Sequence, residues 1–148
     1  RCADVTGVQT CALPICASID EWYLDLTGTE ALHAHETLEE TAARIRGTVH
    51  RETGMWLSIG GGSSKLIAKL AAERAKPRPK TDATGVKVVP ASDEGAFMCT
   101  LALAEIPGIG PKLQAKLAAV GLIRVEDVLP HDRSTLARWL GRRPAEWL

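Results

Sequence analysis

The sequence predicts an α+β fold, in which short strands and packed helices are joined to a small domain made only of helices. Residues 17–90 alternate between stretches with the two-residue period of strands and stretches with the 3.6-residue period of helices. From residue 91 onward only helical periods occur, broken at Pro107-Gly108 and near Gly121. At 148 residues and 45% apolar content, the chain can form one modest domain or parts of two. Strands mixed with helices, followed by helices alone, indicate this class.

The first element is a predicted hairpin from Ser18 to Thr27. Residues 17–28 read ASIDEWYLDLTG, in which apolar and polar positions alternate after an acidic pair. That pair, Asp20 and Glu21, suits a common ion best at a hairpin turn, because neighbouring side chains on one strand point to opposite faces. Carboxylate oxygens suit Mg²⁺, which takes one or two of them together with substrate phosphates. An exposed acidic turn without a metal is the alternative.

A helix and a strand are predicted next. Thr37 and Glu40 have the spacing of a capping box, and the helix they begin should run to about Glu52 and pack on the sheet. Its buried stripe would be Leu38, Ala42, Ile45 and Val49. Alternation from Met55 to Ile59 predicts a strand that ends at the glycines 60–62.

A second helix should begin at a cap on Ser63 or Ser64 and end near Lys76-Pro77. Its buried stripe would consist of Leu66, Ile67, Leu70 and Ala71. A polar linker over 78–84 leads to a strand at 86–89, which Pro90 ends.

The strand–glycine–helix unit at 59–70 is a candidate anion site. Glycines let a backbone approach an anion closely, and a helix N-terminus offers unpaired N–H groups and a favourable dipole. Lys65 lies in the first turn, where the dipole disfavours a cation, and a bound phosphate would remove that conflict. Lys69 shares its face. The sequence is not a Walker A motif, and an exposed lysine after a flexible turn is the alternative.

Residues 104–113 read AEIPGIGPKL and resemble a helix-hairpin-helix. Pro107 and Gly108 would end one helix, and Pro111 suits the first turn of the next. Leu113, Leu117 and Val120 would form the buried stripe of that helix, with Gly121 after its end. The backbone of Gly108, Ile109 and Gly110 and the charge of Lys112 would contact a DNA phosphate without reading bases. An ordinary helical hairpin is the alternative.

Composition agrees with a polyphosphate or nucleic-acid ligand without deciding between classes. The chain has 18 basic and 18 acidic residues, yet 17–54 holds eight acidic and three basic residues, and 65–87 holds seven basic and two acidic. No stretch has the length of a membrane span, and there is no signal-peptide pattern. The four cysteines match no zinc motif, so we expect reduced thiols and a cytoplasmic protein without a membrane partner.

Taken together, these blocks resemble the Y-family (translesion) DNA polymerases of the DNA polymerase IV type. They come in the family's order: ASIDEWYLDLTG, LSIGGGSSKLIAKLA, AKP, GVKVVP and IPGIGPK. The resemblance covers about residues 17–148 and implies part of a palm domain over 17–90, with an antiparallel sheet and packed helices. A small helical thumb with the helix-hairpin-helix would follow over 91–148. The family's glycine loop carries fewer glycines than 60–62.

The resemblance also implies a function. The parent enzyme would add deoxynucleotides to a primer by two-metal nucleotidyl transfer past damaged template, in DNA repair. Asp20 and Glu21 would hold Mg²⁺, and Asp25 would be structural. Lys65, with Lys69 one turn on, would contact the triphosphate. The partners would be primer–template DNA and a deoxynucleoside triphosphate, with a sliding clamp as a further candidate for the full-length protein.

Residues 1–16 show neither alternation nor helical period, and VQTCALPIC at 8–16 looks foreign to the domain. In the family, a strand with another metal-binding aspartate precedes the acidic motif, and a further DNA-gripping domain follows the thumb. We therefore expect a polymerase fragment that is inactive alone. Two alternatives remain: a non-catalytic helix-hairpin-helix DNA-binding module, and a small nucleotide-binding enzyme built on the glycine loop. Lesion preference, fidelity, clamp binding and oligomeric state are not encoded in these segments.

Overall fold

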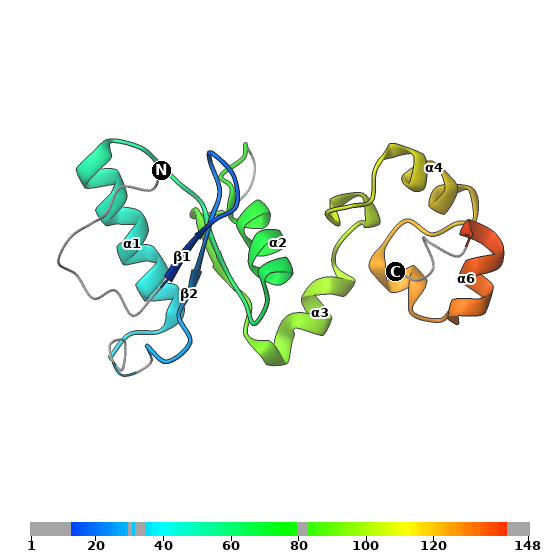
Figure 1. Cartoon of the computed structure of the whole chain (residues 1–148), viewed down its shortest axis with the longest axis horizontal. Helices are drawn as coiled ribbons and strands as arrows, with labels where there is room; N and C mark the ends of the chain where they lie inside the picture. Colours follow the sequence, from blue (N-terminus) through cyan, green and yellow to red (C-terminus); the bar gives the residue numbers. More distant parts are fainter. Residues whose placement is uncertain (1–12, 30, 32–34, 80–82, 142–148) are drawn as a thin grey trace. The chain divides into compact units, whose positions relative to one another are not determined.

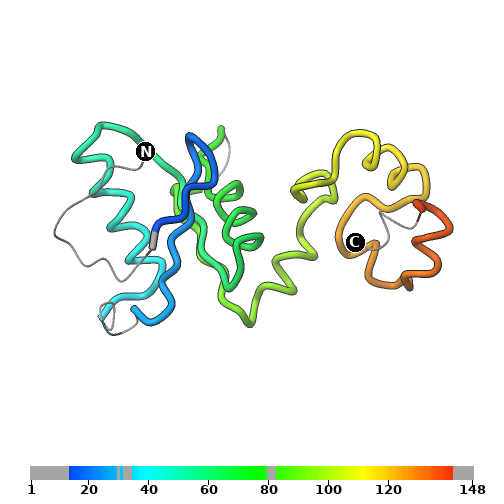
Figure 2. The backbone as a smooth tube through the Cα atoms, viewed as in Figure 1, coloured from blue at the N-terminus to red at the C-terminus, as the bar shows by residue number. Residues whose placement is uncertain are grey.

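The chain forms two compact units, residues 1–58 and 59–148, in a computed structural model that describes residues 13–29, 31, 35–79 and 83–141 (Figures 1 and 2). Strands and helices mix up to residue 88, and only helical elements follow, so the predicted α+β class is confirmed. The division between the units falls inside the expected palm segment, and the expected boundary near residue 90 stays a prediction. No helix in the described ranges is long and apolar enough to cross a membrane.

The first unit contains the predicted hairpin, shifted toward the N-terminus. Strand β1 (Leu13–Cys16) pairs antiparallel with β2 (Trp22–Asp25), with Cys16 opposite Trp22 and Leu13 opposite Asp25. Strand β1 lies within residues 1–16, where the sequence showed neither alternation nor helical period. Four residues are too few for a period to be visible, and pairing with β2 supplies the hydrogen bonds that hold them extended. Residues 1–12 lie outside the described residues.

Helix α1 (Leu38–Thr53) begins where its capping box predicts. The Thr37 Oγ1 accepts from the Glu40 N–H at 3.2 Å, and the Glu40 carboxylate accepts from the Thr37 N–H at 2.7 Å. Gly54, at φ 72°, ends the helix in the left-handed conformation. Of the predicted stripe only Ala42 is buried, while Leu38 is 54% exposed.

The second unit opens with a strand–helix–strand arrangement. Strand β3 (Ile59–Gly61) pairs parallel with β4 (Val86–Val88), and helix α2 (Lys65–Ala75) is part of the connection between them (Figure 1). This pair departs from the expected antiparallel sheet because a helix crossover returns the chain in the same direction. The strand expected over 55–59 begins only at Ile59, and it includes Gly60 and Gly61.

The remaining elements are helical, and several match the sequence expectation. Leu136 and Leu140 on α6 are buried, and Asp132 caps this helix by accepting from the Thr135 N–H at 2.8 Å. Gly121, at φ 82°, follows α4 as expected. The elements in order are η2 (Ala91–Asp93), α3 (Glu94–Cys99), η3 (Leu103–Glu105), α4 (Pro111–Ala119), α5 (Val125–Val128) and α6 (Arg133–Leu140).

Two apolar clusters lie in the second unit. The larger one joins Leu70 of α2 to the helical elements, and it contains Leu70, Leu101, Leu103, Ile106, Ile109, Leu117, Leu122, Leu136 and Leu140. The smaller one contains Ile67, Ala71 and Val89. Phe97 and Met98 of α3 pack against both clusters. Leu66 is 42% exposed and Val120 36%, so neither belongs to its predicted stripe.

Candidate functional site

The acidic pair lies in the turn between β1 and β2, as the hairpin pattern predicts. The N–H groups of Ala17 and Ser18 both donate to the Glu21 carbonyl, at 2.9 and 3.1 Å, and close the turn. Asp20 is exposed, and its Oδ1 accepts from the Ser18 hydroxyl at 2.6 Å. Both carboxylates therefore stand on one short, hydrogen-bonded turn.

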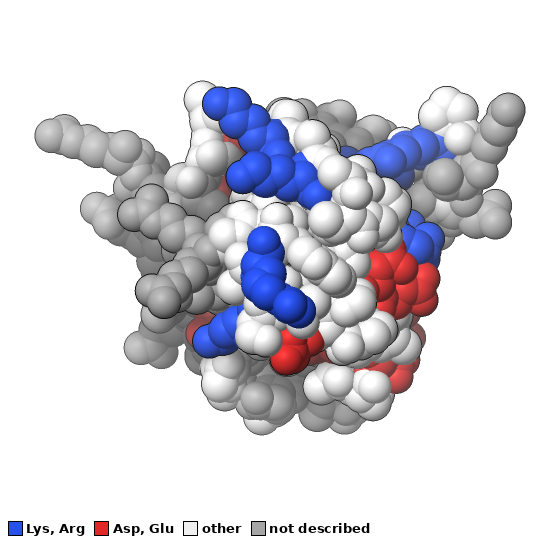
Figure 3. All heavy atoms as spheres, turned by 90° about the vertical axis from the view of Figure 1, so that its right-hand side faces the viewer, with Lys and Arg blue, Asp and Glu red and all other residues white. Residues whose placement is uncertain are grey.

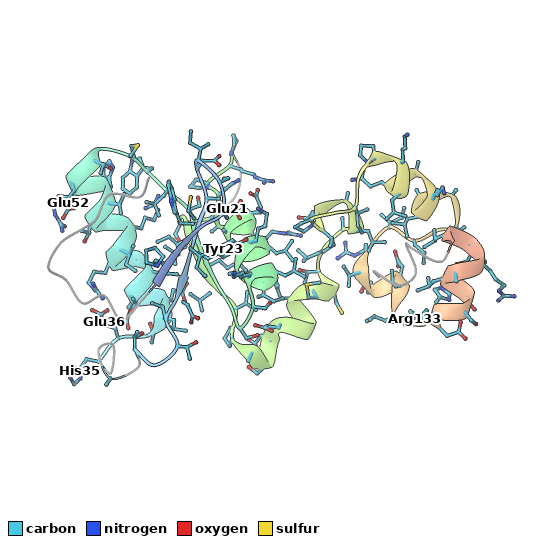
Figure 4. All side chains as sticks on the ribbon, viewed as in Figure 1. Glu21, Tyr23, His35, Glu36, Glu52 and Arg133 are labelled. Carbon is cyan, nitrogen blue, oxygen red and sulfur yellow. The ribbon has the colours of Figure 1, made fainter. Side chains whose placement is uncertain are left out.

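Glu21 is oriented by a residue that the sequence analysis did not single out. It is half-buried, and its Oε1 accepts from the Tyr23 hydroxyl at 2.9 Å (Figure 4). The two residues are two positions apart on the same strand face, so alternation was the available signal. Asp25 has a local role, because its Oδ1 accepts from the Thr27 N–H at 3.0 Å.

Two carboxylates on one turn fit part of a Mg²⁺ site. Within the described part of the chain, no group of three or more His, Cys, Asp or Glu side chains is close enough to hold a metal ion. Mg²⁺ is commonly bound by one or two carboxylates plus phosphate oxygens and water, so the pair fits such an ion only with ligands from elsewhere.

The glycines of the β3–α2 segment serve close packing. A Cβ on Gly60 would lie 2.1 Å from the Ala68 carbonyl oxygen and 2.2 Å from the Ala72 nitrogen. A Cβ on Gly62 would lie 2.3 Å from the Cγ2 of Ile67. The missing side chains therefore let β3 press against α2. The predicted approach of an anion to this backbone stays a prediction.

The beginning of α2 already has an acidic partner within the chain. Ser64 is the N-cap and accepts from the Ile67 N–H at 3.3 Å. Next to it, the N–H and hydroxyl of Ser63 donate to the two oxygens of Glu94, at 2.7 and 2.8 Å. Sequence reasoning missed Glu94, because nothing local to residue 94 signals a contact across 31 positions. The predicted residues Lys65 and Lys69 lie on α2, exposed and half-buried respectively.

The segment 106–112 forms a tight turn followed by α4. The Ile109 N–H donates to the Ile106 carbonyl at 3.1 Å, and Gly108 takes φ 96°, which favours glycine. The side chain of Ile109 is 4% exposed and its N–H is already bonded, and its predicted DNA contact stays a prediction. Before the turn stands a 3₁₀ turn, η3, in place of the expected first helix.

The start of α4 remains open to an external acceptor. Gly110 is its N-cap and makes no side-chain cap, and Pro111 has no N–H to satisfy. A Cβ on Gly110 would meet nothing within 4 Å. Lys112, on the first turn of α4, is exposed. Figure 3 shows the side that includes α4 and α6, where Lys and Arg side chains project from a surface that also has patches of Asp and Glu.

The structure thus gathers the predicted site residues into three places. Asp20 and Glu21 share the turn of the first unit, and Lys65 and Lys69 share α2. Gly108, Gly110 and Lys112 share the turn that leads into α4. The last two places belong to the second unit.

Comparison with known proteins gives one consistent family. Residues 11–73 match the impB/mucB/samB family. The chain is 36% identical to the DNA polymerase IV of Caulobacter vibrioides over 124 residues, 84% of this chain and 29% of the relative. It is 40% identical to the DNA polymerase IV of Dehalococcoides mccartyi over 104 residues, 70% of this chain and 25% of the relative.

Solved structures agree. The crystal structure of DinB from Sulfolobus solfataricus superposes with a TM-score of 0.71 at 28% identity, over 88% of this chain and 36% of that one. An insertion ternary complex of Dbh DNA polymerase gives a TM-score of 0.70 at 26% identity, again over 88% of this chain and 36% of that one. The chain spans roughly a third or less of the curated relatives' length. The chain belongs to the Y family of DNA polymerases.

Proposed function

We propose that the chain is the part of a translesion DNA polymerase that carries two metal-binding carboxylates, a nucleotide-contacting helix and a DNA-contacting turn. The whole protein would extend a primer past damaged template by adding deoxynucleotides, in DNA repair. The observation that carries this proposal is the position of Asp20 and Glu21 on the hairpin turn, inside the segment that matches the family. A cytoplasmic location is part of this proposal.

The acidic turn supplies ligands for the reaction. Asp20, which is exposed, and Glu21, held by the Tyr23 hydroxyl, would hold the Mg²⁺ ions. Mg²⁺ bound there would lend its charge to the attacking and leaving oxygens of an in-line displacement. The remaining ligands must come from substrate phosphates and from other carboxylates of the whole protein.

The nucleotide triphosphate would meet the lysines of α2. Because the Ser63 donors are taken by Glu94, the positive charges of Lys65 and Lys69 carry this part of the proposal. Lys65 stands at the first position of the helix and is the more exposed of the two. Replacing Lys65 with alanine should raise the KM for nucleotide more than replacing Lys69 does, and an unchanged KM would remove Lys65 from the site.

A segment exchange tests the activity. Residues 17–141 of this chain would replace the matching segment of the Caulobacter vibrioides DNA polymerase IV, and primer extension would be measured with Mg²⁺ on intact and lesion-bearing templates. We expect extension that is lost with Asp20→Ala and reduced with Glu21→Ala. Asp93→Ala, which removes an exposed carboxylate bonded to Ser92, is the control. A folded chimera without extension, or one indifferent to Asp20→Ala, would contradict the proposal.

DNA would be held at the turn before α4, through the backbone of Gly108 and Gly110 and the charge of Lys112. Such contacts are to phosphate, so binding should be weak, independent of sequence and steeply dependent on salt. Lys112→Ala should lower the slope of log affinity against log salt by roughly one unit on duplex DNA. Arg51→Ala on α1 removes the same charge in the other unit and should leave the slope unchanged.

The structure bears differently on the two alternative functions, the small nucleotide-binding enzyme and the non-catalytic DNA-binding module. The small nucleotide-binding enzyme rested on an exposed glycine loop, and Gly60 and Gly62 instead allow β3 to pack on α2. The non-catalytic DNA-binding module keeps the same turn as the polymerase and differs only in the acidic pair. The Asp20→Ala result in the chimera therefore separates it from the polymerase. A sliding clamp is a further candidate partner of the whole protein.

A further inference from the structure

An ionic contact connects α2 to the residue just before the DNA-contacting turn. One terminal nitrogen of Arg74, on the last turn of α2, lies 2.8 Å from the Oε2 of Glu105. The same nitrogen donates to the Thr100 carbonyl at 3.3 Å. Arg74 therefore spans from α2 to both ends of the short segment 100–105.

Glu105 is held from two sides, and it leads directly into the turn. Its Oε2 accepts from the Ala102 N–H at 2.8 Å as well as from Arg74, and its own N–H donates to the Ala102 carbonyl at 2.9 Å. The next residue, Ile106, supplies the carbonyl that closes the turn with Ile109. Displacement of Glu105 would thus move the first residue of the turn.

The contact between Arg74 and Glu105 lies beside apolar packing between α2 and the turn. Arg124 also donates to the Thr100 carbonyl, at 3.2 Å, so two arginines meet at one acceptor. Leu70, one turn before Arg74 on α2, is buried in the same cluster as Ile106 and Ile109. Apolar packing sets the distance between α2 and the turn. The directional bonds to Glu105 and Thr100 set the angle at which the chain enters the turn.

We propose that Arg74 is a positioning residue for DNA binding, which acts through Glu105 to hold residues 106–110 in their phosphate-contacting conformation. This inference rests on the proposed DNA contact. This proposal predicts an effect on DNA binding opposite to the one expected from charge alone. Removing an acidic residue next to a DNA-binding turn should strengthen binding if charge alone matters. If Glu105 positions the turn, its removal weakens binding.

The test uses the 148-residue chain, duplex DNA and a salt titration, with Arg74→Ala, Glu105→Ala and the double variant. Both side chains are about 40% exposed, so each single change should weaken binding by about two- to fivefold. The double variant should bind no more weakly than the weaker single variant, because both remove one restraint. Asp93→Ala, which removes an acid outside this network, should leave affinity unchanged or slightly higher.

The salt slope separates positioning from direct contact. A positioning role leaves the slope of Arg74→Ala equal to the parent's, whereas a phosphate contact by Arg74 lowers it by roughly one unit. Tighter binding by Glu105→Ala, or a lowered slope for Arg74→Ala, would overturn the proposal. Circular dichroism confirms that each variant is folded at the temperature of the titration.

Hydrogen exchange keeps the inference testable if the proposed DNA contact is wrong. The Ile109 amide, bonded to the Ile106 carbonyl, should exchange faster in Arg74→Ala and Glu105→Ala than in the parent and in Asp93→Ala. If the parent chain fails to bind duplex, the DNA contact falls and the exchange rates decide the positioning. Unchanged exchange at Ile109 would overturn it.

Discussion

Two glycines in the turn before α4 exist for different physical reasons. Gly108 takes φ 96°, a conformation that side chains disfavour, so its role is structural. Gly110 has an ordinary φ of −79°, and a Cβ there would meet nothing within 4 Å of the chain. Among the described residues, no contact requires a glycine at position 110. The proposed approach of a DNA phosphate would give the glycine a role there.

We therefore predict that Gly110→Ala leaves stability unchanged or slightly higher while weakening duplex binding about tenfold. A methyl group would stand between the phosphate and the N–H groups at the start of α4, and losing one such contact typically costs this much. Thermal unfolding and duplex titration measure the two effects separately. Gly108→Ala is the contrast, because it should lower stability as well. Gly110→Ala that binds like the parent would show that no phosphate approaches there.

From the sequence, the positions of individual site residues could be predicted only where a local pattern indicates them. Asp20 and Glu21 could be placed on a turn because alternation and turn chemistry act over a few residues. The partners of Glu94 and Arg74 could not be read in the same way. Glu94 and Arg74 meet residues 31 positions away, and only the packing of α2 against the helical elements brings them together.

Among the elements, β3 shows why a strand pattern alone can mislead. Alternation at Met55 to Ile59 predicted the strand, yet Met55 and Trp56 are more than 60% exposed and the strand runs over Ile59–Gly61. Pairing with β4 and close packing against α2 decide its position, and both depend on residues beyond the local pattern. Helices fared better because capping boxes, prolines and glycines mark their ends locally.

The packing role of the glycines gives a stability prediction at the element scale. Gly60→Ala places a methyl group about 2 Å from the backbone of α2 and should destabilise the chain by about 2–3 kcal/mol through overpacking. Gly47→Ala is the matched control in α1, where an added Cβ meets nothing within 4 Å. It should stabilise by about 0.5–1 kcal/mol, since alanine is the better helix former. Urea unfolding measures both, and a neutral Gly60→Ala would contradict the packing role.

Helix α6 gives a prediction on pH. Hydrogen bonds from the side chain and N–H of Thr135, and then from Ser134, hold the pKa of Asp132 below its ordinary value. A carboxylate whose pKa is lowered on folding stabilises above its unfolded pKa, and this stabilisation is lost as the pH falls through the folded pKa. Asp132→Ala should therefore lower the unfolding temperature at neutral pH, with the difference from the parent shrinking in acid. A pH-independent difference would contradict this account.

At the scale of the whole molecule, the proposed metal ligands of the described residues are the two carboxylates of one turn. This acidic turn has two carboxylates, and within the described residues no third His, Cys, Asp or Glu completes a metal site with them. Two-metal centres need bridging carboxylates and a fixed geometry, and a centre short of a ligand loses both ion affinity and alignment. The elements in the second unit that would bind nucleotide and DNA require no metal.

We predict that the 148-residue chain binds duplex DNA but does not extend a primer with Mg²⁺ and nucleotides. The relatives named DNA polymerase IV are about three or more times longer than the matched segment, so the missing ligands have a source outside it. A primer-extension assay at high enzyme concentration, with the Caulobacter vibrioides enzyme as positive control, measures the outcome.

Template-dependent extension by this chain that disappears with Asp20→Ala would prove the prediction wrong, and would show that two carboxylates and substrate phosphates suffice. Extension that survives Asp20→Ala would point to a contaminating polymerase. Duplex binding without extension would support DNA binding by the helical elements alone. It would also indicate that catalysis requires a more complete metal site.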